Sequence, residues 1–148
     1  MFLTIKKIPK VFWSSKKPYN LRPNFSTFIF LCIGLAIFGL GEGLLIISLT
    51  GASPWSVLAQ GISINLGYSI GLVTFFVSLF ALSLWIFLSQ KPGIGTILNI
   101  IIIALMIDLS IFYIDTPINY IGQLSMAVFA VLLVGLGSGI YLIANLGP

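Results

Sequence analysis

Four long runs of apolar residues constrain the fold of this 148-residue sequence more than any other feature. A helix needs about 20 consecutive apolar residues to cross the roughly 30 Å hydrocarbon core of a bilayer. Each run reaches this length and contains no Lys, Arg or His. The sequence therefore predicts four transmembrane helices, over Phe25–Leu49, Ser69–Ser89, Ile94–Ile114 and Ile121–Leu146.

The composition excludes a water-soluble domain. Apolar residues make up 59% of the chain and charged residues 7%, whereas soluble domains carry about 45–50% and about 25%. The apolar residues form continuous runs, not the alternating segments of about ten residues that build membrane β-barrels. The first run also exceeds the about 7–15 residues of a signal-peptide core, so we expect it to be retained. The predicted fold class is an all-α, polytopic helical membrane protein.

The residue types also exclude several chemistries. The sequence has no His and one Cys, Cys32, so it cannot form a Cys/His zinc site, a Ser-His-Asp triad or a disulfide framework. The expected spans contain no pair of a nucleophile and a base. We therefore expect no enzymatic activity, no metal centre and no cofactor.

The positive charges predict the orientation. Six of the seven cations precede residue 23: Lys6, Lys7, Lys10, Lys16, Lys17 and Arg22. The seventh, Lys91, follows the second span. Because Lys and Arg favour the cytoplasmic side, we expect a cytoplasmic N-terminus and Asp115 in an outer loop. Residues 1–24 then form a basic cytoplasmic arm that binds the anionic inner leaflet or a protein partner, and no nucleic acid.

The segment Ala52–Gly67 is too short and too polar to span the bilayer. Ser53 followed by Pro54 resembles a helix N-cap with proline at the first helical position. We expect a short interfacial or re-entrant helix that starts with a turn at Pro54 and Trp55, and that Gly61 and Gly67 break or end.

A glycine motif recurs at an offset of 96 residues. Gly39, Gly41, Gly43 and Gly51 correspond to Gly135, Gly137, Gly139 and Gly147. A repeat of this length contains three spans, an odd number, so successive units have opposite orientations, as in many secondary transporters. We expect a 3+3 inverted repeat in which residues 25–119 form the first unit and residues 120–148 begin the second. The second unit would stop after one span, so we expect a truncated chain or a fragment of a longer reading frame.

These residues also resemble a known family. The stretch GLGEGL…LTGASPWSVLAQGIS (Gly39–Ser63), KPGIGTILN (Lys91–Asn99), Asp108 and the late GLGSGIYLIANLGP resemble the YczE/YyaS/YitT family of bacterial integral membrane proteins. The resemblance implies a multi-pass protein of the bacterial inner membrane, with six helices in complete members and no firmly assigned activity. This sequence ends where members continue with a polar segment.

Glu42 and Asp108 are the acidic residues expected within spans. They lie seven and six residues before the expected outer ends of their helices, so both lie roughly 9–10 Å inside the outer boundary. A carboxyl group at this depth normally faces the bundle interior. Each is protonated, hydrogen-bonded to the other or to backbone, or neutralised by a bound cation. Two roles remain open for these carboxyl groups. They form a proton- or cation-coupled site, or they form hydrogen bonds that join helices.

Asn99 and the glycine pairs complete the candidate residues. Asn99 lies nine residues before Asp108, about 180° around a helix, so we expect a separate polar contact near the inner side, structural or ligand-binding. Gly39/Gly43 and Gly135/Gly139 form G-x-x-x-G motifs that let helix backbones approach closely, with Gly41 and Gly137 between them. The same glycines also expose backbone that could coordinate an ion beside Glu42.

Two functions follow. The first is a transporter-like permease for an unknown small solute or ion, with Glu42, Asp108 and Asn99 as the candidate proton, cation or substrate site. The second is a non-transporting membrane protein that organises or regulates a partner. We expect the lipid bilayer as surroundings and a proton or cation as ligand, with homo-oligomers or a protein partner left open.

Overall fold

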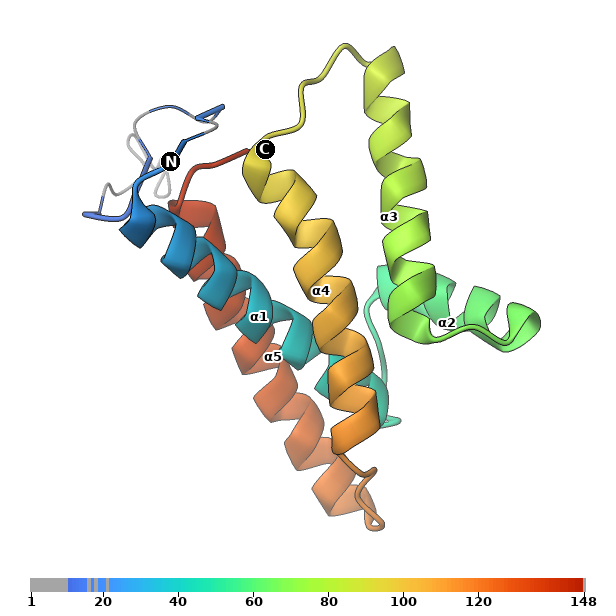
Figure 1. Cartoon of the computed structure of the whole chain (residues 1–148). Coiled ribbons are helices and arrows are strands. Elements are labelled where there is room, and N and C mark those ends of the chain that lie inside the picture. The colour runs from blue at the N-terminus through green and yellow to red at the C-terminus, as the bar shows by residue number, and fades with distance from the viewer. Residues whose placement is uncertain (1–10, 16, 18, 21, 148) are drawn as a thin grey trace, which may run out of the picture.

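The computed structural model describes residues 11–15, 17, 19–20 and 22–147. These residues form five α-helices and no strand, which confirms the all-α prediction. In chain order the helices are α1 (Phe25–Ile47), α2 (Pro54–Leu66), α3 (Ile70–Phe87), α4 (Ile94–Tyr113) and α5 (Tyr120–Ile143) (Figure 1).

Three of these helices, α1, α4 and α5, are long and apolar enough to cross a membrane on their own. The helices α2 and α3 meet at a bend of 116°, and they add a fourth span only when the bent pair is counted as one. The described chain therefore has three to four candidate spans, and the expected second span is the second half of a broken helix.

The helices end within three residues of the predicted positions. The first helix ends at Ile47, before the predicted Leu49, and α5 ends at Ile143, before the predicted Leu146. Leu49 and Asn145 both have positive φ angles, 56° and 53°. A right-handed helix cannot continue through a left-handed residue, so the backbone at these two positions explains the shorter helices.

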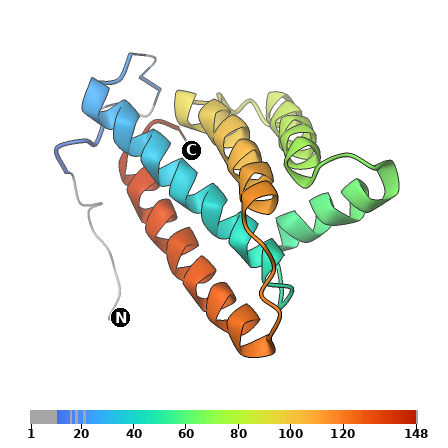
Figure 2. The same cartoon turned by 60° about the horizontal axis from the view of Figure 1, so that its bottom comes forward.

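The helix α1 is the centre of the bundle. It packs against α5 on one side and α4 on the other, and α3 packs against α4 (Figures 1 and 2). Leu31 and Leu35 of α1 form the core with Ile103 and Ile107 of α4 and with Ala144 and Leu146, which follow α5.

Glycines determine how closely α1 approaches its neighbours. A Cβ on Gly39 would lie 2.7 Å from Met106, and one on Gly43 would overlap Ser110, so this pair lies against α4. Gly41 lies against α5 instead. The small-residue faces of α1 therefore allow the close packing that such motifs allow in membranes.

Gly41 and Gly137 make reciprocal contacts across the α1–α5 interface. A Cβ on Gly41 would meet the carbonyl oxygen of Ala130 and the backbone of Val134, both at 2.9 Å. A Cβ on Gly137 would meet the carbonyl oxygen of Gly34 at 2.7 Å and the backbone of Phe38. Gly34 and Ala130 differ by 96 positions, as do Phe38 and Val134.

The prediction that Gly135 and Gly139 of α5 form a helix-packing face is not confirmed in the described chain. A Cβ on Gly135 or Gly139 would meet nothing within 4 Å. These two residues therefore lie on an open face of α5, and only the middle glycine of this motif, Gly137, is packed against another helix of the described chain.

The short helix α2 begins and ends as predicted. The side chain of Ser53 accepts a hydrogen bond from the backbone N–H of Ser56, Pro54 occupies the first turn, and Gly67 has the left-handed φ of 72° that ends the helix. The prediction that Gly61 breaks the helix was wrong, because Gly61 lies inside a continuous α2.

The face of α2 that packs on the protein is small and polar. Its buried residues are Ser56, Ala59 and Ser63, whereas Trp55 and Leu58 are exposed. Beyond its first turn, α2 extends away from the bundle (Figure 2). The apolar side chains beyond that turn, such as Leu58, therefore face outward, which suits contact with lipid, whereas Trp55 belongs to the first turn beside the bundle.

One end of the bundle carries the described cations. The backbone N–H of Gly95, in the first turn of α4, donates to the carbonyl of Leu146, and the backbone of Gly93, in the α3–α4 connection, lies against the same carbonyl. The backbone N–H of Ser15 donates to the carbonyl of Ala144, so the α3–α4 connection, the residues after α5 and the N-terminal arm meet there. Lys91 and the arm residues Lys17 and Arg22 belong to these segments, while Asp115 lies in the connection at the opposite end (Figure 1). Lys6, Lys7, Lys10 and Lys16 lie outside the described residues.

Candidate functional site

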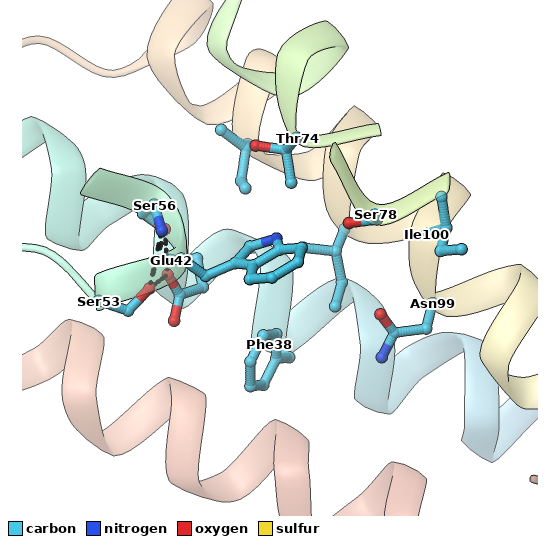
Figure 3. A pocket seen from close by; sticks show the side chains of 11 residues that line it. Phe38, Glu42, Ser53, Ser56, Thr74, Ser78, Asn99 and Ile100 are labelled. Carbon is cyan, nitrogen blue, oxygen red and sulfur yellow. Dashed lines mark hydrogen bonds between the residues drawn. The ribbon is translucent and has the colours of Figure 1, made fainter. Parts of the chain in front are cut away.

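Glu42 is a buried carboxylate that joins α1 to the start of α2. Its side chain is only 7% exposed. Oε2 accepts hydrogen bonds from the hydroxyl groups of Ser53, at 2.8 Å, and Ser56, at 2.6 Å (Figure 3). Ser53 is the N-cap of α2 and Ser56 is in its first turn. The local helix start therefore provides both donors.

The position of Glu42 suits a negative charge. The N-terminus of a helix carries a partial positive charge, and hydroxyl donors stabilise a carboxylate by charge-assisted hydrogen bonds. Among the described residues, the hydrogen-bond partners of Glu42 are the two serine hydroxyl groups, and the described cations Lys17, Arg22 and Lys91 all lie outside the helices. Within this part of the chain, hydroxyl groups and the start of α2 therefore hold Glu42, and no ion pair does.

A cavity of about 310 Å³ lies beside Glu42, where α1, α2, α3 and α4 converge. Thr74 and Ser78 of α3 and Asn99 of α4 face Glu42 across it (Figure 3). The remaining lining residues are aromatic or aliphatic: Phe38, Trp55, Ile100, Ile103 and Ile107. A largely apolar pocket with a few convergent polar groups is the usual form of a small-molecule site.

Several polar atoms of this cavity have no protein partner. Within the described part of the chain, Oε1 of Glu42, the Ser78 hydroxyl and the Asn99 amide form no hydrogen bond, whereas the Thr74 hydroxyl donates to Ile70 at 2.8 Å. Figure 3 shows one oxygen of Glu42 directed away from the two serines. None of these atoms is fully buried, since Trp13 Nε1 is the one fully buried side-chain polar atom without a partner among the described residues, so they are accessible from the cavity and can bind a ligand.

Asp108 holds the start of α3 in a second, separate arrangement. Its Oδ2 accepts a hydrogen bond from the hydroxyl of Ser69 at 2.6 Å, and its Oδ1 accepts one from the backbone N–H of Gly71 at 2.7 Å. Both carboxylate oxygens therefore have partners. Asp108 lines a different cavity, with Ser69, Leu72 and Phe75 of the α3 segment among its neighbours.

The structure brings two of the three candidate residues together. Glu42 and Asn99 line one cavity, and Asp108 lines another. Asn99 and Asp108 thus face different cavities, in line with their separation of nine residues on α4. Of the alternatives open for the two carboxyl groups, a hydrogen bond between them is not found, because Glu42 accepts from Ser53 at the start of α2 and Asp108 accepts from Ser69 at the start of α3.

Sequence reasoning missed the partners of both carboxylates. The sequence pattern predicts Ser53 only as an N-cap, and it assigns no role to Ser56, Ser69, Thr74 or Ser78. One signal was present, since Thr74 and Ser78 lie four residues apart and therefore share a face of an otherwise apolar helix. The pairing of Glu42 with the S-P-W-S segment depends on the chain reversal after α1, which no local pattern encodes.

The arrangement can hold a cation or a proton. One carboxylate, hydroxyl groups and an amide line the cavity, and no Lys or Arg of the described part of the chain does. The described residues contain no group of three or more His, Cys, Asp or Glu side chains that could hold a metal ion. The chemistry of the lining therefore favours a single positive charge on the ligand.

Comparisons with known proteins identify the family. Residues 25–148 match the model of a family of unknown function, DUF6198. A Haemophilus influenzae relative, described as an uncharacterized protein, is 32% identical over 143 residues, which cover 97% of this chain and 65% of the relative. A Bacillus subtilis relative, described as the uncharacterized membrane protein YczE, is 32% identical over 131 residues, covering 83% of this chain and 55% of the relative.

The chain thus spans about two thirds or less of the length of these relatives. No solved structure matches it. The apolar helices, the family match and the membrane-protein relative agree with one another, and the chain belongs to the DUF6198 family of YczE-like membrane proteins.

Proposed function

We propose that this protein is a transporter-like permease that binds a small solute or ion in the Glu42 cavity. The observation that carries the proposal is a 93% buried carboxylate, one oxygen of which has no hydrogen-bond partner among the described residues, in a cavity of about 310 Å³. A buried ionisable residue inside a membrane bundle is costly, and such residues usually mark an ion or substrate pathway.

The broken helix supports this function. The helices α2 and α3 meet at a 116° bend and both border the cavity. Secondary transporters commonly form their binding sites from discontinuous helices near the middle of the membrane. In this proposal α2 is a re-entrant segment and α3 completes a fourth span.

The reciprocal glycine contacts support an inverted repeat. Gly41 meets Ala130 and Val134, and the residue 96 positions later, Gly137, meets Gly34 and Phe38, the repeat equivalents of that pair. Reciprocal contacts of this kind arise when a two-fold axis relates two elements. We infer that α1 and α5 are equivalent helices of a 3+3 inverted repeat, related by an approximate two-fold axis in the membrane plane.

The distribution of charge supports an orientation. Lys17, Arg22 and Lys91 belong to segments that meet at one end of the bundle. Because Lys and Arg close to span ends favour the cytoplasm, we infer an inner-membrane protein with a cytoplasmic N-terminus and Asp115 outside. No group in the cavity suggests a reaction, so the proposed role is binding and passage rather than catalysis.

Transport currents test the proposal. The purified full chain is reconstituted in liposomes on a sensor membrane, and the outside solution is switched to more protons, sodium or methylammonium at constant ionic strength. We expect a transient current with at least one of these cations in the wild type and its loss in Glu42→Gln. The matched control is Asp115→Asn, which removes a carboxylate outside the cavity and should leave the current unchanged.

The alternative function makes the opposite prediction. A membrane protein that only organises or regulates a partner gives no current above that of protein-free liposomes, and Glu42→Gln changes nothing. That result would overturn the permease proposal.

A further inference from the structure

The charge of the Glu42 cavity limits its ligand to a monocation. Among the described residues, Glu42 is the one acidic side chain that lines it, and no basic side chain does. Divalent metal ions prefer six or more oxygen ligands, usually with more than one carboxylate. Here Oε2 already accepts two hydroxyl hydrogens, which leaves Oε1 as the free carboxylate oxygen. A single positive charge matches what remains.

The volume and the walls of the cavity indicate an organic cation. About 310 Å³ is much larger than a bare metal ion and falls in the range of small-molecule pockets, about 300–1,000 Å³. Two aromatic residues, Phe38 and Trp55, and three isoleucines line it. Aromatic rings attract ammonium groups, and quaternary ammonium compounds are commonly recognised in this way.

Polar groups lie at both ends of the cavity. Glu42, with Ser53 and Ser56, is at one end, and Ser78 and Asn99 are at the other (Figure 3). Neither the Ser78 hydroxyl nor the Asn99 amide has a hydrogen-bond partner among the described residues. A ligand with an ammonium group at one end and a hydroxyl or carbonyl group at the other would pair with both.

We propose that the Glu42 cavity binds a small organic monocation, an ammonium compound with a polar group at its far end. This inference rests on the proposed function, because it names the class of solute for the same cavity. The ammonium group lies by Oε1 of Glu42 among the aromatic side chains, and the far polar group meets Ser78 and Asn99.

Choline and its uncharged isostere test this proposal. Choline has a quaternary ammonium group and a hydroxyl group, and dimethylbutanol has the same shape with carbon in place of the charged nitrogen. Calorimetric titration of the purified full chain in detergent should show choline binding, and thermal unfolding should shift to a higher Tm with choline. Dimethylbutanol should produce neither effect, and sodium should not compete with choline.

Two variants connect binding to the cavity. Glu42→Gln removes the charge and should weaken choline binding about tenfold or more. Trp55→Leu, at a position that is 42% exposed, should weaken it about threefold through the loss of an aromatic wall. Asp115→Asn, with its carboxylate in the distant loop, should bind choline as the wild type does.

The outcomes separate this inference from the proposed function. Equal binding of dimethylbutanol and choline, or choline binding that Glu42→Gln and Trp55→Leu leave unchanged, overturns the organic monocation. A Glu42-dependent current with protons or sodium but no choline binding overturns the ligand class and keeps the permease. If neither a Glu42-dependent current nor choline binding is found, the permease function and the ligand class are both overturned.

Discussion

Ser69 donates its hydroxyl hydrogen to Asp108 at 2.6 Å, so α3 begins at a carboxylate that α4 supplies. The same hydroxyl accepts a hydrogen bond from the backbone N–H of Leu72, which makes Ser69 the cap of this helix. Glu42 holds the start of α2 in the same way, through Ser53 and Ser56. Both halves of the bent pair therefore start at a carboxylate from a long helix.

Removing the Asp108 carboxylate should loosen the start of α3. Asp108→Ala leaves the N–H of Gly71 without its acceptor and should lower the free energy of unfolding by about 2 kcal/mol. Asp108→Asn keeps one acceptor oxygen and should cost about 1 kcal/mol. Thermal unfolding in detergent and hydrogen exchange at the first turn of α3 measure both effects. Wild-type stability and exchange in Asp108→Ala would show that Asp108 does not hold α3.

The glycines of α5 provide a matched pair of substitutions. Gly137→Ala places a methyl group against the backbone of α1, 2.7 Å from the carbonyl oxygen of Gly34, and should destabilise the α1–α5 pair by about 1–3 kcal/mol. Gly135→Ala meets open space and should be neutral or stabilise α5 by up to about 1 kcal/mol, since alanine favours helix.

Thermal unfolding of the two alanine variants compares them directly. The order expected is Gly135→Ala at or above the wild type and Gly137→Ala below it. A large loss of stability in Gly135→Ala would mean that its face of α5 is covered in the folded protein.

Cysteine labelling of intact cells tests the orientation. In a Cys32→Ser background, Ile118→Cys lies in the exposed α4–α5 connection and Ser89→Cys lies beside Lys91 at the other end of the bundle. A membrane-impermeant thiol reagent should label the first from outside and the second only after permeabilisation. The reverse pattern would place the N-terminus outside. Ser63 is a poorer probe, because its hydroxyl is buried and donates to the carbonyl of Tyr68.

The helices could be predicted from sequence because their signals are local. Long apolar runs indicate spans, and Ser53, Pro54 and Gly67 mark the ends of α2. The same apolar runs predict that Glu42 and Asp108 lie at the same depth in the membrane. Equal depth does not decide whether the two side chains meet. Their actual partners, Ser56 and Ser69, follow from the rotation of each helix and the 116° bend, which are tertiary properties.

The glycine motif shows a similar limit. From the sequence alone, the glycines of one motif cannot be told apart. In the structure, Gly41 of α1 packs against α5 and Gly137 of α5 packs against α1, whereas Gly135 and Gly139 face open space. Which face of a helix is covered depends on where its neighbours lie. That information is carried by contacts between residues about a hundred positions apart.

The proposed function requires a negative charge at Glu42, in a cavity that a soluble cation can enter. The most direct measurement is the rate at which a cysteine at Asn99, in a Cys32→Ser background, reacts with a trimethylammonium thiosulfonate and with its neutral methyl analogue. We predict that both reagents react, and that Glu42→Gln lowers the cationic-to-neutral rate ratio several-fold, because a carboxylate concentrates cations in a low-dielectric cleft. An unchanged ratio, or no reaction with either reagent, would contradict the account.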